Sequence, residues 1–174
     1  MPQPLPPADP SAGRSDPPRP RGPTAVDGGL LDTAVLAADL KAEARRLGFS
    51  RVGVAPAVPA PRQDLVRQWL ARGLAGAVEP WFTRQIDLRS DPRHLLPAVR
   101  SVVMLATDHA ITPPTERPGH GRIARYAWGD DYHDLLRDRV NRLVAWLAER
   151  APGCQSRGVV DSAPLAEREF AWLA

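Results

Sequence analysis

Cysteine and lysine are almost missing from this 174-residue sequence, which contains only Cys154 and Lys41. A lone cysteine cannot form an internal disulfide, and it cannot by itself ligate an iron–sulfur cluster or a structural zinc ion. The sequence also lacks an apolar run of about 18 residues and a secretory signal at its N-terminus. These absences favour a cytoplasmic protein with no membrane span.

Familiar cofactor motifs are missing too. There is no glycine-rich dinucleotide fingerprint, no phosphate-binding P-loop and no HExxH zinc motif. The four histidines are scattered along the chain, at His94, His109, His120 and His133. We therefore expect no metal site.

The charge balance is mildly basic, with 23 Lys and Arg against 20 Asp and Glu, a formal net charge of +3. Such a small excess does not identify a partner. Nearly all of the positive charge is arginine, which suits phosphate binding but is also what a GC-rich genome produces.

Composition divides the chain into two parts. Residues 1–29 are rich in Pro, Arg, Gly and Ser, and they predict a disordered tail because they offer too little apolar surface to bury. Residues 30–174 predict one α/β domain, a small sheet flanked by helices. The last helix ends within its apolar stretch, so we expect the domain to be incomplete at its C-terminus.

Apolar periodicity and turn residues predict the elements of this domain. Helices are expected at 32–47, 63–72, from 131 to about 150, and from near Pro164. Strands are expected at 49–55 and 101–106, and 155–160 is a possible third strand. The run 101–106 is apolar throughout, so it predicts a central strand covered on both faces. Residues 74–100 read as a polar stretch interrupted by proline.

Two short segments concentrate groups that could carry chemistry. Residues 125–133 place aromatic, acidic, basic and imidazole side chains at a junction of a loop and a helix, a common location for binding sites. The alternative is that Asp131 caps the helix while the aromatic rings pack. Asp161 follows an apolar segment and precedes a helix; it could be a general acid or a helix cap.

Several motifs resemble the N-terminal half of epoxyqueuosine reductases. The similarity covers residues 36–174, and two blocks are specific: Arg-Tyr-Ala-x-Gly-x-Asp-Tyr-His at 125–133 and Val-Asp-Ser-Ala-Pro-x-x-Glu-Arg at 160–168. The resemblance implies reduction of epoxyqueuosine to queuosine at the wobble position of tRNA, in the anticodon loop. It also implies base-off cobalamin, two 4Fe-4S clusters, an external electron donor and a monomer.

The resemblance assigns roles to six residues. Asp161 matches the family's proton donor beside cobalamin, and Arg84 matches an arginine that contacts the cofactor. Tyr126 and Arg168 match cofactor-binding positions, while Tyr132 and His133 match substrate-binding positions.

The iron–sulfur domain of the family has no counterpart in this sequence. We therefore expect a fragment that does not turn over alone. The alternative is a stand-alone module that binds a corrinoid or docks a partner without catalysis, and a weaker one is an RNA-binding module unrelated to cobalamin.

Overall fold

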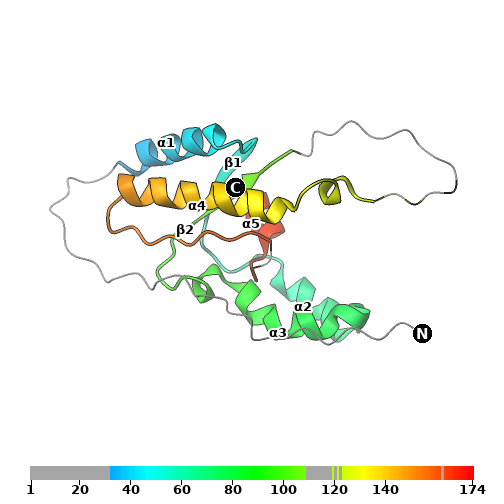
Figure 1. Ribbon diagram of the computed structural model, residues 1–174. Coiled ribbons are helices and arrows are strands. Elements are labelled where there is room, and N and C mark those ends of the chain that lie inside the picture. Colours follow the sequence, from blue (N-terminus) through cyan, green and yellow to red (C-terminus); the bar gives the residue numbers. More distant parts are fainter. Residues whose placement is uncertain (1–31, 109–118, 120, 122, 162) are drawn as a thin grey trace, which may run out of the picture.

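The structure is a computed structural model, and it describes residues 32–108, 119, 121, 123–161 and 163–174. The predicted tail at 1–29, together with His109 and His120, lies outside these residues. The predicted α/β class is confirmed (Figure 1). The described elements are α1 (Thr33–Arg46), β1 (Arg51–Pro56), α2 (Gln63–Ala71), α3 (Glu79–Ser90), β2 (Ser101–Ala106), α4 (Tyr132–Arg150) and α5 (Glu167–Leu173).

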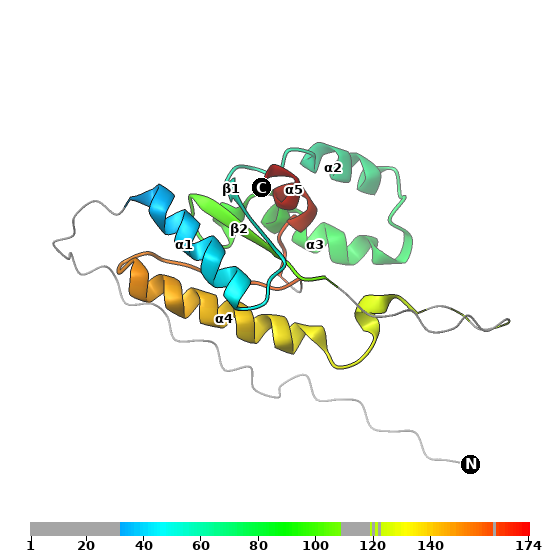
Figure 2. The same cartoon turned by 90° about the horizontal axis from the view of Figure 1, so that it is seen from above.

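The two described strands pair antiparallel, with Arg51 opposite Ala106 and Pro56 opposite Ser101. Because side chains alternate along a strand, each face of this ribbon carries its own set of apolar residues. Helices α1 and α4 lie side by side along one face, and α5 lies against the other (Figure 2). The sheet is thus the middle layer of three.

The first core lies between the sheet and the α1/α4 layer. Its buried members are Leu40, Ala44, Phe49 and Leu143, and Val52, Val103 and Leu105 pack against them from the strands. Each large apolar side chain buried in this core stabilises the folded state by about 1.5–3 kcal/mol. This core fixes the position of α4, which carries the candidate site at its N-terminal end.

The second core lies under α5 and joins Ala55, Leu165 and Phe170. The end of the chain approaches β1 so closely that a Cβ atom on Gly53 would lie 2.6 Å from Cβ of Ala174. Only glycine fits this position unless the backbone shifts. The prediction that residues 101–106 are covered on both faces is confirmed, since the two cores occupy opposite sides of β2.

Helix boundaries follow the sequence signals closely. Asp32 caps α1 by accepting from the backbone N–H groups of Ala34 and Val35, and Gly48 ends it with a φ of 93°. Asp131 caps α4 in the same way through the N–H of His133. The caps satisfy amides that have no partner within the helix.

Three expectations about the elements are wrong. Residues 79–90 form the helix α3. Pro80 does not interrupt it, because Pro80 lies in the first turn, where the backbone N–H that proline lacks has no partner within the helix. Residues 155–160 are not a strand; the segment packs along α4 instead, with Gly158 against Val140. Consequently β2 is not a central strand of the described sheet, which has two strands only.

One smaller difference concerns the start of the last helix. The last helix begins at Glu167, three residues beyond Pro164, since Pro164 belongs to the preceding turn.

Among the described helices, none is both long and apolar enough to cross a membrane.

Candidate functional site

Five side chains gather where α4 begins and where the segment before α5 passes it. They are Tyr126, Asp131, Tyr132, His133 and Asp161, and we refer to them as the Asp161 cluster. Four of them belong to the block at 125–133, and Asp161 comes from the second block. Two motifs that are separate in sequence thus form one site.

Both carboxylate oxygens of Asp161 have partners on α4. The hydroxyl of Tyr132 donates to Oδ2, and Nε2 of His133 lies 2.9 Å from Oδ1. The other ring nitrogen of His133, Nδ1, lies 2.7 Å from Oδ1 of Asp131. His133 therefore bridges two carboxylates, an arrangement that fixes the plane of the imidazole ring.

Contacts between aromatic rings also hold the side chains of the Asp161 cluster in place. The rings of Tyr132 and His133 stack with centroids 4.2 Å apart, and the edge of Tyr126 meets Tyr132 with centroids 5.9 Å apart. Such contacts restrict the rotamers of the two side chains that hold Asp161. The Asp161 side chain itself remains 42% exposed, so a second molecule can reach it.

The electrostatics of the cluster favour a charged imidazole and a neutral phenol. The hydrogen bond to Asp131 raises the pKa of His133 above its usual 6.5, and Asp161 adds to the effect. The hydrogen bond to Asp161 raises the pKa of Tyr132 to about 12. The pKa of Asp131 is lowered, chiefly by the backbone N–H of His133. Near neutral pH, Tyr132 is therefore a hydrogen-bond donor to Asp161.

A small cavity of about 180 Å³ lies beneath the cluster. Its walls are largely apolar, from β2, α4 and the segment before α5, and its polar lining residues are Tyr132, Asp161 and Glu167. Glu167 was not among the residues selected from the sequence. The signal was present, since the second block contains a glutamate at this position, but its place in the wall of the cavity depends on tertiary packing.

The two arginines selected from the sequence lie elsewhere. Arg84 is exposed on α3 and Arg168 is exposed on α5. Within the described part of the chain, neither forms a hydrogen bond or ion pair with Asp131, Tyr132, His133 or Asp161. The structure thus brings together Asp161, Tyr126, Tyr132 and His133, but not Arg84 and Arg168.

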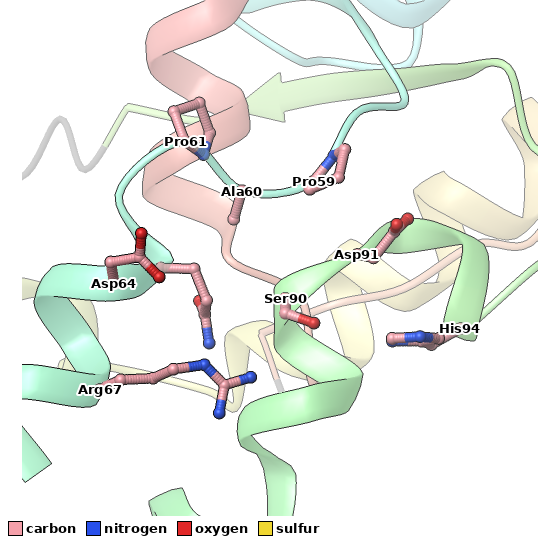
Figure 3. Close-up of a pocket in the computed structure, with 9 residues that line it drawn as sticks. Pro59, Ala60, Pro61, Asp64, Arg67, Ser90, Asp91 and His94 are labelled. Carbon is pink, nitrogen blue, oxygen red and sulfur yellow. The ribbon is translucent and has the colours of Figure 1, made fainter.

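A second, larger hollow of about 420 Å³ lies between the start of α2 and the end of α3 (Figure 3). Two of its polar side chains are engaged with neighbouring groups of the protein: Gln63 donates to the carbonyl of Ile86, and His94 Nδ1 donates to the carbonyl of Asp87. It lies apart from the Asp161 cluster. Across the described residues, no group of three His, Cys, Asp or Glu side chains is arranged to hold a metal ion.

Comparison with known proteins agrees with the two blocks. Residues 89–162 match the family model "Epoxyqueuosine reductase QueG, DUF1730". An epoxyqueuosine reductase from Gloeobacter violaceus is 36% identical over 143 residues, which cover 81% of this chain and 44% of that protein. The Escherichia coli K12 enzyme is 32% identical over 146 residues, covering 81% and 38%.

Solved structures show the same fold. A crystal structure of epoxyqueuosine reductase with an epoxyqueuosine-modified tRNA-Tyr stem loop has a TM-score of 0.63 and 26% identity, covering 80% of this chain and 38% of that one. The structure from Streptococcus thermophilus, at 20% identity and a TM-score of 0.61, supports the fold alone.

The three-layer fold and the matched segment define a DUF1730-type α/β domain. Residues 89–162 match the epoxyqueuosine reductase family, as the two blocks indicated, and the chain spans about two fifths of the length of the relatives compared.

Proposed function

We propose that this chain supplies the proton-donating half of an epoxyqueuosine reductase, with Asp161 as the acid. One observation carries the proposal. Tyr132 and His133, from the first motif, both contact the exposed carboxyl group of Asp161, which belongs to the second motif. A carboxyl held by two partners, yet open to solvent on its remaining side, suits proton transfer to a bound molecule.

The reaction sets the demands on this site. Converting the epoxide to the alkene takes two electrons and two protons and releases the oxygen as water. Asp161 donates a proton to the epoxide oxygen as its carbon–oxygen bond breaks. Tyr132 and His133 orient the carboxyl group, and the charged imidazole stabilises the carboxylate that remains.

Cobalamin fits this chain only as a partner lying against its surface. The cavity of about 180 Å³ is below the range of about 300–1,000 Å³ typical of small-molecule sites, so the described residues cannot enclose a corrin ring. The donor set does fit, because the guanidinium groups of Arg84 and Arg168 are exposed and suit the propionamide edge of a corrin. Cobalamin, when bound, supplies the two reducing electrons.

The electrons must originate outside this sequence. Cys154 is its only cysteine, so the chain has no ligand set for a 4Fe-4S cluster. We therefore propose that iron–sulfur clusters on another segment or polypeptide, charged by an external donor, reduce the cofactor, and that this chain alone does not turn over. Its substrate is tRNA carrying epoxyqueuosine, as in the relative solved with a modified stem loop.

The test joins the chain to the iron–sulfur portion of a close relative and replaces Asp161 with Asn. Asparagine retains the size of the side chain, so the free energy of unfolding should change by no more than about 1 kcal/mol. The rate of epoxide reduction should fall by about 10² to 10⁴-fold, the usual contribution of general acid catalysis. Cobalamin binding, followed by absorbance, should be kept.

Asp138→Asn is the matched control, since Asp138 lies on the exposed side of α4 and pairs with Arg142. It should leave the rate unchanged. A parent-like rate for Asp161→Asn would show that Asp161 is not the acid. If the joined protein without substitutions does not bind cobalamin, the part of the proposal that concerns the cofactor is wrong.

A further inference from the structure

The aspartate that caps α4 also binds a side chain. The caps of α1 and α4, Asp32 and Asp131, have nearly the same backbone angles, with φ of −65° and −64° and ψ of 107° and 108°. In each cap Oδ1 accepts a backbone N–H from two residues ahead, at 2.9 Å. Oδ1 of Asp131 accepts in addition from the imidazole of His133, whose Nδ1 lies 2.7 Å away. Capping alone does not require a carboxylate, because serine and asparagine cap helices about as well as aspartate does.

The contact with Asp131 decides where His133 carries its hydrogen. Hydrogen bonds from His133 lower the pKa of the Asp131 carboxyl, so this group is ionised near neutral pH and can only accept. Nδ1 of the imidazole is therefore the donor. The other ring nitrogen, Nε2, lies 2.9 Å from Oδ1 of Asp161. With a hydrogen fixed on Nδ1, a single proton is shared between Nε2 and the carboxyl group of Asp161.

His133 is contacted from two parts of the chain. In the described residues, the titratable groups that face it are Asp131 and Tyr132, at the start of α4, and Asp161, from the segment before α5. The two carboxylates raise the pKa of His133, whereas Tyr132 is neutral because its own pKa is about 12. The Tyr132 ring stacks on the imidazole at an interplanar angle of 25°, and its hydroxyl donates to the second oxygen of Asp161. These contacts hold the imidazole with Nε2 directed at the acid.

We propose that Asp131 is a positioning residue for the acid: it fixes a hydrogen on Nδ1 of His133 and thereby presents Nε2 to the carboxyl group of Asp161. The inference rests on the proposed function. As Asp161 gives its proton to the substrate oxygen, the imidazole that Asp131 holds donates through Nε2–H to the carboxylate left behind. Asp131 itself acts only through the ring. It combines two roles, since the same oxygen caps α4 and orients the imidazole.

Asp131→Ser separates the two roles, because serine caps a helix about as well as aspartate but brings no carboxylate to Nδ1. The measurement is ¹⁵N NMR of the imidazole nitrogens in the full 174-residue chain. His133 should titrate at a clearly lower pH than in the parent, and Nδ1 should be the nitrogen that loses its hydrogen. Asp131→Asn is the second variant. It keeps an oxygen acceptor but removes the charge, so it should also lower the titration of His133.

Asp32→Ser is the matched control, since Asp32 caps α1 with the same geometry and should leave the titration of His133 unchanged. In the joined protein, Asp131→Ser should lower kcat more near pH 8 than near pH 6, where the imidazole is protonated without help, and it should leave KM for the tRNA unchanged.

A parent-like titration of His133 in both Asp131 variants would show that Asp131 is a helix cap only, and so would a loss of kcat that is equal at both pH values. Either outcome leaves the proposed function intact, because the role of Asp161 is measured separately by the rate of Asp161→Asn. A parent-like rate for Asp161→Asn overturns the proposed function and this inference together.

Discussion

His133 connects the two carboxylates of the site, and its protonation depends on both. Asp131 faces Nδ1 and Asp161 faces Nε2, so the charged imidazole has an acceptor on each side. Removing Asp131 would therefore affect Asp161 through the ring between them. Perturbed pKa values in neighbouring groups of this kind are typical of functional sites.

The raised pKa of His133 makes the stability of the protein depend on pH. Since the folded pKa lies above the unfolded value of 6.5, the stabilisation is fully present below pH 6.5 and is lost as the pH rises through the folded pKa. His133→Gln should flatten this part of the curve. Urea unfolding between pH 5 and 9 measures it, and an equal decline in the variant would contradict the assignment.

At the scale of elements, α5 links the site to the core. Glu167 begins this helix and lines the same cavity as Asp161, and Phe170, one turn later, is fully buried against the sheet. Trp172 on the same helix is 70% exposed and lies beside Arg62, 5.6 Å from ring centroid to guanidinium carbon. The two aromatic residues therefore contribute very differently to the docking of α5.

Phe170→Ala should lower the free energy of unfolding by about 3–5 kcal/mol, the usual loss for a buried aromatic residue. Trp172→Ala should cost about 1 kcal/mol or less, in keeping with an exposed cation–π contact. Chemical denaturation of the two variants compares them directly. Similar losses would mean that α5 is not held chiefly through Phe170.

At the scale of the whole molecule, the described helices and strands form three layers, with β1 and β2 in the middle. Among the residues that the structure describes, both cores begin at Leu40. We therefore propose that the folded domain begins near residue 30 and that residues 1–29 contribute no stability. Their composition, rich in proline and poor in apolar residues, is the basis of this proposal.

Deleting residues 1–29 should change the free energy of unfolding by less than about 0.5 kcal/mol, the range of ordinary surface changes. Deleting residues 1–46 is the contrasting variant. It removes α1 with Leu40 and Ala44 and should prevent cooperative folding. Thermal unfolding followed by circular dichroism distinguishes the two, and a large loss from the shorter deletion would place the domain boundary earlier.

Local signals in the sequence determined much of this protein. Asp32, Gly48 and Asp131 mark helix ends because capping and turn geometry depend on neighbours in the chain. The motif blocks at 125–133 and 160–168 also singled out Asp161, Tyr132 and His133 as candidates, and these three side chains meet in the fold. The helix at 79–90 was missed because a proline in a first turn resembles a break.

Only the tertiary structure decided what those residues face. Residues 155–160 have the composition of a strand, yet they pack along α4 because Gly158 lets the backbone approach Val140. Glu167 and Arg89 lie 78 positions apart in sequence, and no local pattern relates them. Burial and Coulomb interaction depend on distance in space, so the influence of Asp161 and Arg89 on the pKa of Glu167 appears only once the chain is folded.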